Sequence, residues 1–184
     1  MIRVFAFVIS LVFSASPAWS APDDPRLDRL FLQLREARTE AEIATLMSQI
    51  GGIWLSSGSD TIDLLMQRAQ EASEKGAPDV ALDLLDRTVQ LAPRYAEAWR
   101  RRGAVQAAEG NGEEALGDLR EALQIEPRHF GALNEIARIL EEAGDTQGAA
   151  EALRRLNELI PNAEGLRQRL QKLEGGRKPQ GDPI

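Results

Sequence analysis

The sequence has 184 residues, of which 43% are hydrophobic, and its formal net charge at pH 7 is −7. This composition is typical of one folded, helix-rich domain, and the negative charge disfavours general binding to nucleic acid or to anionic membranes. Cysteine is absent and His129 is the only histidine, so disulfides and thiolate chemistry are excluded. We therefore expect no metal site and no cofactor.

The first twenty residues have the pattern of a secretory signal peptide. Arg3 precedes an apolar run from Val4 to Phe13, and small residues lead to a cleavage point after Ser20. The apolar run is shorter than the about 20 residues that a membrane-spanning helix needs. We expect residues 1–20 to be removed, which leaves no stable membrane span; retention as an anchor is the alternative. In a bacterium, the protein would then be periplasmic.

Residues 21–60 are expected to form a helical hairpin. The first helix, within residues 24–37, has leucines at amphipathic spacing, and Thr39 with Glu42 has the pattern of a capping box that opens a second helix reaching Trp54. The sequence SSGSD then interrupts the pattern. This hairpin is either a degenerate repeat or a cap that covers the apolar face of the first repeat, and we favour the cap.

The sequence repeats with a period of 34 residues from residue 61 to 163. It divides this stretch into three units, 62–95, 96–129 and 130–163. Four sets of identical residues share the period: Pro93, Pro127, Pro161; Ala81, Ala115, Ala149; Gly76, Gly110, Gly144; and Leu85, Leu119, Leu153. A fixed period of this length indicates stacked supersecondary units.

Each unit has the pattern of two helices joined by a turn. The glycine ends the first helix, because glycine tolerates a left-handed backbone, and the proline ends the second. A further column of small residues holds Ala69, Gly103 and Ala137, where two helices can approach closely. Residues 164–174 predict a C-terminal capping helix, and residues 175–184 have the composition of a disordered tail.

The chain from Ile62 to Ala163, and the middle unit most clearly, resembles the tetratricopeptide repeat (TPR) family and in particular its small exported bacterial members. The matching positions are Trp99, Gly103, Ala115, Leu119, Ala122 and Pro127. The outer units match less well. The resemblance implies an all-α fold, a right-handed superhelical stack of helical hairpins, with a concave groove that binds a protein or peptide partner. By family register, the groove residues are Asp63, Met66, Gln67, Gln70, Glu97, Arg100, Arg101, Ala104, Asn134, Glu135 and Arg138.

The preferred hypothesis is a periplasmic adaptor that binds a peptide segment of an envelope partner. Arg100, Arg101 and Arg138 would bind carboxylates of that ligand. The alternative is a structural subunit that packs through its convex face or terminal helices. Binding to RNA and an unrecognised carboxylate enzyme are weaker hypotheses, and we expect neither a nucleic-acid partner nor enzymatic activity.

Three further residues carry specific expectations. Trp54 and Trp99 fall on apolar stripes, which predicts packing in the core rather than ligand stacking. Arg102 occupies a position where the family prefers leucine, so it is expected to lay its stem along the core and send its charge to solvent. His129 is expected on the surface of a turn.

Overall fold

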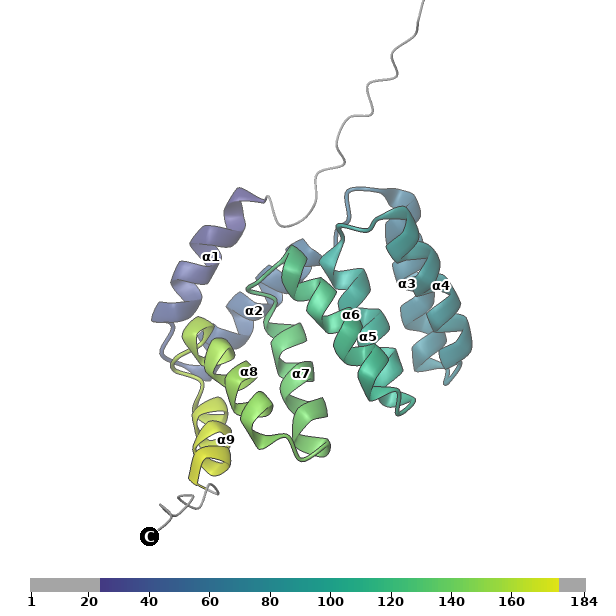
Figure 1. Cartoon of the computed structure of the whole chain (residues 1–184). Helices are drawn as coiled ribbons and strands as arrows, with labels where there is room; N and C mark the ends of the chain where they lie inside the picture. Colours follow the sequence, from purple (N-terminus) through teal and green to yellow (C-terminus); the bar gives the residue numbers. More distant parts are fainter. Residues whose placement is uncertain (1–23, 176–184) are drawn as a thin grey trace, which may run out of the picture.

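The computed structural model describes residues 24–175, whose regular structure is entirely α-helical (Figure 1). The helices are α1 (Pro25–Glu36), α2 (Glu40–Trp54), α3 (Asp60–Glu74), α4 (Pro78–Leu91), α5 (Ala96–Ala108), α6 (Gly112–Ile125), α7 (Phe130–Glu142), α8 (Thr146–Leu159) and α9 (Glu164–Gly175). The expected signal peptide and residues 176–184 of the expected tail lie outside the described residues.

The three 34-residue units form three hairpins that stack side by side. The hairpins are α3–α4, α5–α6 and α7–α8, and each packs on the next through contacts of α4 with α5 and of α6 with α7. Figure 1 shows the row, with α3 and α4 at one end and α8 and α9 at the other. The expected all-α solenoid is therefore confirmed.

The glycine at the end of each first helix has the predicted left-handed backbone. Gly76, Gly110 and Gly144 have φ values of 69°, 83° and 79°. In each repeat the following residue donates its N–H to the carbonyl five residues back, as Asn111 does to Gln106 at 2.9 Å. This is the Schellman arrangement, which satisfies carbonyls at the helix end and turns the chain into the second helix.

The column of small residues lies where the two helices of each hairpin cross. Ala69 and Ala137 are buried, and Gly103 is packed so closely that an added Cβ would lie 3.0 Å from the Ala115 carbonyl oxygen and from Leu119 Cγ. The α5–α6 crossing is therefore the one for which the chain uses glycine rather than alanine.

The N-terminal hairpin is present, but its position differs from the expected one. Thr39 and Glu42 form the predicted capping box at the start of α2. The buried residues of α1 and α2 share one core with α6, α7 and α8, whereas the separate core of the first repeat contains no residue of α1 or α2. The hairpin thus covers the second and third repeats and leaves the first repeat uncovered.

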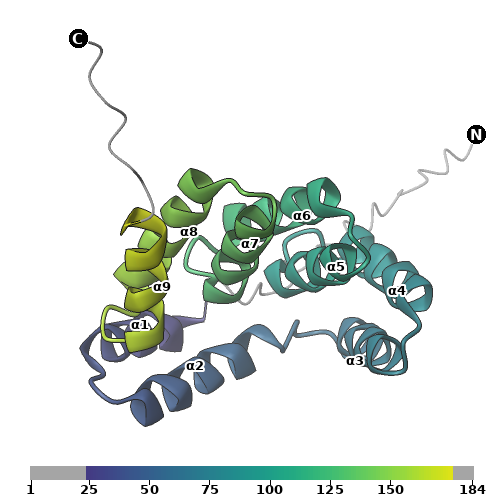
Figure 2. The same ribbon diagram turned by 90° about the horizontal axis from the view of Figure 1, so that it is seen from below.

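Helix α2 runs along the turns that connect successive repeats (Figure 2). Near its C-terminal end, the Leu55 carbonyl accepts a hydrogen bond of 2.9 Å from the Tyr95 hydroxyl, in the turn before α5. Trp54 stacks on His129, in the turn before α7, with ring centroids 4.2 Å apart. Before the other end of α2, the Ala37 carbonyl accepts from Asn162, in the turn before α9, at 2.8 Å.

The repeat period explains why α2 and the residues that flank it meet all three turns. Tyr95 and His129 are equivalent residues, each two positions after the repeat proline, and Asn162 follows Pro161 directly. Since hairpins of one period stack in a row, their equivalent turns also lie in a row. A helix that runs along this row, together with its flanking residues, can then contact each of them.

Candidate functional site

A pocket of about 330 Å³ lies between the first helices of the first two repeats, α3 and α5. Its walls combine small apolar side chains with a few polar ones. The residues that line it are Ala69, Gln70, Ser73, Gly76, Pro78, Leu85, Arg100, Arg101, Ala104, Val105, Ala108 and Glu109. The volume is at the lower end of the range that ligand pockets occupy.

Four of the expected groove residues line this pocket: Gln70, Arg100, Arg101 and Ala104. Arg101 joins the two walls, because its Nη1 donates to Gln70 Oε1 at 3.2 Å. Val105, Ala108 and Glu109 complete the α5 wall and were missed from the sequence. Their spacing along the chain from Arg101 was the available signal, since residues four, seven and eight positions apart share a helix face.

The three other first-repeat candidates do not line this pocket. Met66 is only 3% exposed and belongs to the core of the first repeat, so the prediction that it faces a groove is wrong. Asp63 accepts hydrogen bonds from the backbone and the hydroxyl of Ser57, at 2.8 and 2.6 Å. It therefore fixes the segment between α2 and α3. Gln67 is exposed and donates to Glu71 on its own helix.

The third-repeat candidates already form contacts with other side chains of the protein. Asn134 accepts a hydrogen bond of 2.8 Å from Arg169 of α9. Arg138 forms ion pairs with Glu135 and Glu142, both on its own helix. These residues do not meet the pocket between α3 and α5.

Glu97 is buried at the centre of a charged cluster on α5. Its two oxygens accept hydrogen bonds from Arg100 Nη2 and Nε at 2.7 and 2.8 Å, and Arg101 Nε donates to Oε1 at 2.8 Å. His129 Nε2 lies 3.2 Å from Oε2. Glu97 itself was expected to line the groove, and the structure instead buries it beneath the two arginines.

The surroundings of Glu97 keep it ionised. Burial opposes the charged form, but the hydrogen bonds from Arg100 and the approach of His129 outweigh this effect and hold the pKa of Glu97 well below its usual range. The carboxylate therefore neutralises one of the two neighbouring guanidinium charges. It also occupies the bidentate face of Arg100 that a ligand carboxylate would use.

His129 links this cluster to α2, which corrects the expectation of a surface residue. It is 1% exposed, and its Nδ1 accepts from the Ala132 N–H at 3.4 Å. Trp54 covers the other side of the ring. A contact chain of Trp54, His129, Glu97 and Arg100 therefore runs from the N-terminal hairpin to the wall of the pocket.

Arg102 also differs from its expected role. Its guanidinium lies over the Trp99 ring, 4.8 Å from the centroid, and pairs with Asp118 at 2.6 Å and with Asp86 at 2.7 Å. The guanidinium therefore pairs with Asp86 of the first repeat and with Asp118 of its own repeat instead of facing solvent. Trp54 is buried as expected, whereas Trp99 is half-buried.

Within residues 24–175, no group of three or more histidine or acidic side chains could hold a metal ion. None of the described helices has the length and apolar character that crossing a membrane requires.

Comparison with known proteins agrees with this architecture. Models described as tetratricopeptide repeat match residues 66–129 and 106–172. A TPR repeat-containing protein of Rhizobium etli is 40% identical over 142 residues, which cover 77% of this chain and 70% of the relative.

Solved structures share the fold at lower identity. The first TPR of Spaghetti (RPAP3), bound to an HSP90 peptide, gives a TM-score of 0.58 at 17% identity, over 62% of this chain and 90% of that one. The Yersinia enterocolitica type III secretion chaperone SycD, in complex with a peptide of the translocator YopD, gives 0.56 at 19% identity, over 64% and 89%. The period, the stacked hairpins and the Rhizobium relative together place this chain in the tetratricopeptide repeat family.

Proposed function

We propose that the protein is an exported interaction module that binds a peptide segment of an envelope partner in the pocket between α3 and α5. The observation that carries the proposal is the pocket itself, which combines small apolar walls with guanidinium groups on one face of the stack. Two proteins that share the fold were solved with peptides bound, which supports a ligand of the same class.

The chemistry of the walls narrows the expected ligand. Ala69, Ala104 and Val105 offer apolar contact at little steric cost. The Glu97 carboxylate already holds Arg100 and Arg101, so a ligand carboxylate finds no free bidentate partner there. We expect a segment that places a small apolar side chain between α3 and α5 and accepts hydrogen bonds from the remaining guanidinium N–H groups.

The test uses a photo-crosslinking residue at Ala108, an exposed position that lines the pocket. Crosslinking in intact cells, followed by peptide mapping, should give one reproducible partner segment. The same residue at Ala44, exposed on α2 and away from the pocket, is the matched control. Equal products from the two positions would contradict the assignment of the pocket.

A pocket-filling variant provides a second measurement. Ala108→Trp should abolish recovery of the mapped segment, while Ala44→Trp should leave it unchanged. Full recovery with Ala108→Trp would remove this pocket from the proposal.

The export step is part of the proposal and has its own test. The signal-peptide pattern of residues 1–20 supports it. The intact mass of the protein from a periplasmic fraction should correspond to a chain that begins at Ala21. A chain that keeps its first twenty residues and stays with the cytoplasmic fraction would contradict export.

A further inference from the structure

The first repeat leaves uncovered the face on which a preceding repeat would pack. Leu64 of α3 is 47% exposed, whereas its counterparts one and two periods later, Ala98 and Ala132, are both 0% exposed. Ala98 lies in the core that α3 and α4 build, so the preceding hairpin is what buries that position. Within residues 24–175, no hairpin does this for Leu64, because α1 and α2 pack on the later repeats.

Helix α4 continues the same face. Leu91 is 65% exposed, while its counterparts Ile125 and Leu159 are half-buried. Leu84 lies seven residues before Leu91, on the same side of the helix. It packs on the core of the first repeat and is half-buried, whereas its counterparts Asp118 and Ala152 are buried. We call Leu64, Leu84 and Leu91 the leading face. An apolar face of this kind on a soluble protein indicates a contact surface.

The end of the molecule that carries the leading face is negatively charged. Residues 60–91 contain seven carboxylates and three basic side chains, a net charge of −4. Among the described residues, Asp60, Asp79 and Asp83 form no ion pair with a basic side chain, so their charges are free to act on a partner.

The opposite end of the molecule is basic, although the chain as a whole is acidic. It is built by α1, α8 and α9, and residues 25–38 and 146–175 contain nine basic and six acidic side chains, a net charge of +3. In the described part of the chain, the side chains of Arg35, Arg38, Arg155 and Lys172 form no ion pair. We call these four residues the basic end.

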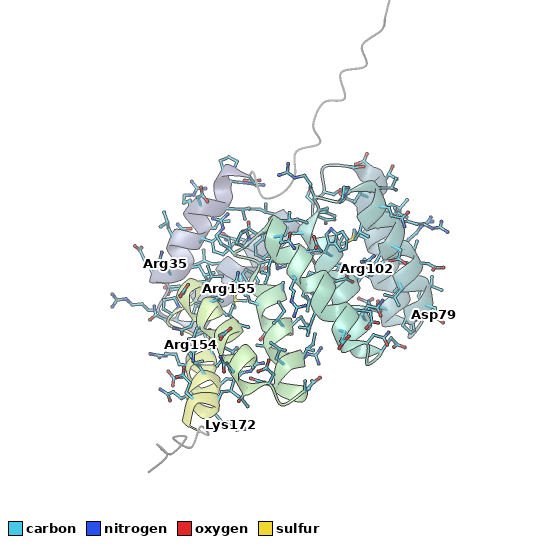
Figure 3. All side chains as sticks on the ribbon, in the orientation of Figure 1. Arg35, Asp79, Arg102, Arg154, Arg155 and Lys172 are labelled. Atoms are coloured by element: carbon cyan, nitrogen blue, oxygen red, sulfur yellow. The ribbon has the colours of Figure 1, made fainter. Side chains whose placement is uncertain are left out.

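The two ends lie on opposite sides of the molecule. Figure 3 shows Arg35, Arg155 and Lys172 on one side and Asp79 on the other. A hollow lined by Arg35, Arg38 and Arg167, with Glu36 and Asn162, opens at the basic end. When two copies lie in a row, the acidic end of one copy faces the basic end of the next, and their charges are complementary.

We propose that the leading face binds the basic end of a second copy of this chain, so that the molecules associate head to tail. The apolar leading face supplies the buried area, and the acidic side chains around it select the basic end. Two leading faces would bring net charges of −4 together, which disfavours a two-fold dimer through this surface. A head-to-tail contact leaves one free face at each end, so association continues into a chain or closes into a ring.

The experiment measures molar mass by light scattering across a concentration series of the protein purified from the cells that produce it. We expect the mass to rise with concentration at low salt and to rise less at high salt, since salt screens exposed charges. A constant monomer mass at every concentration would overturn the proposal.

Two variants identify the surfaces. The head variant carries Leu64→Glu and Leu91→Glu, and the tail variant carries Arg155→Glu and Lys172→Glu. All four positions are exposed, so both variants should keep the helical circular dichroism and the melting temperature of the unmodified protein. Each variant alone should be monomeric.

A mixture of the two variants distinguishes head-to-tail association from a two-fold contact between leading faces. The head variant keeps an intact basic end and the tail variant keeps an intact leading face, so the mixture should form dimers that stop growing. If the tail variant dimerises alone, the contact is two-fold between leading faces and the head-to-tail proposal is wrong. A mixture that stays monomeric would also contradict it.

Discussion

Replacing Gly103 by alanine tests how tightly α5 and α6 cross. An added Cβ at this position would meet the Ala115 carbonyl oxygen and Leu119 Cγ at 3.0 Å, and Asp118 Cβ at 3.2 Å. One of these atoms belongs to the backbone of α6, which cannot rotate away. The variant can therefore form only if the two helices separate, because a shift of the Leu119 side chain alone leaves the contact with the Ala115 carbonyl oxygen.

Two opposing terms set the expected magnitude. Alanine is favoured over glycine inside a helix by about 1 kcal/mol. Overpacking a close crossing costs about 1–3 kcal/mol. We therefore expect Gly103→Ala to lower the free energy of unfolding by about 0–2 kcal/mol, even though alanine is the better helix former.

Gly117→Ala is the matched control, because Gly117 lies within α6 and an added Cβ there would meet no atom within 4 Å. It should raise the free energy of unfolding by about 1 kcal/mol. Urea denaturation followed by circular dichroism measures both variants, and their difference should be about 1–3 kcal/mol. If Gly103→Ala stabilises the protein as much as Gly117→Ala does, the close crossing is not what requires glycine.

Three further predictions concern the contacts of α2 with the repeats and the buried Glu97 carboxylate. Trp54→Ala should lower the free energy of unfolding by about 3–5 kcal/mol, because Trp54 is 3% exposed and packs on His129. It should also increase proteolysis within residues 56–59, and Trp54→Phe should restore most of the protection. Tyr95→Phe should cost about 1 kcal/mol in urea denaturation, since it removes only the hydrogen bond to the Leu55 carbonyl, and a loss several times larger would mean that the hydroxyl has another role. Glu97→Gln should make stability depend less on pH in the acid range. Folding lowers the pKa of Glu97, so the ionised carboxylate stabilises the folded protein at pH values above the unfolded pKa of about 4.5. This stabilisation is lost as the pH falls below that value. Denaturation curves of the two proteins that keep a constant difference from neutral pH down to pH values below 4.5 would contradict this account of Glu97.

The repeat architecture could be predicted from the sequence because each hairpin is specified locally. Gly110 ends one helix and Pro127 ends the next, and the 34-residue period repeats both signals. Local backbone preference and helical periodicity act within one repeat, so they are visible without knowledge of distant contacts. The capping box of Thr39 and Glu42 was predictable for the same reason.

The candidate site was predicted only in part. Family register identified Gln70, Arg100 and Arg101, which do line the pocket. It could not indicate that Glu97, one turn earlier on α5, accepts hydrogen bonds from both arginines. Whether the three side chains meet depends on the groups that bury the Glu97 carboxylate. That burial comes partly from His129, which lies 32 residues further along the chain.

By itself the sequence determined the number and order of the stacked hairpins, since the signals that end helices and keep their crossings close are local. Only the tertiary structure decided where the N-terminal hairpin packs. The apolar stripe of α2 fits a cap on the first repeat as well as it fits the row of turns, and the choice depends on surfaces that Tyr95, His129 and Asn162 form only after the repeats have stacked. That choice also leaves Leu64 and Leu91 exposed, because one hairpin cannot cover both ends of the same stack.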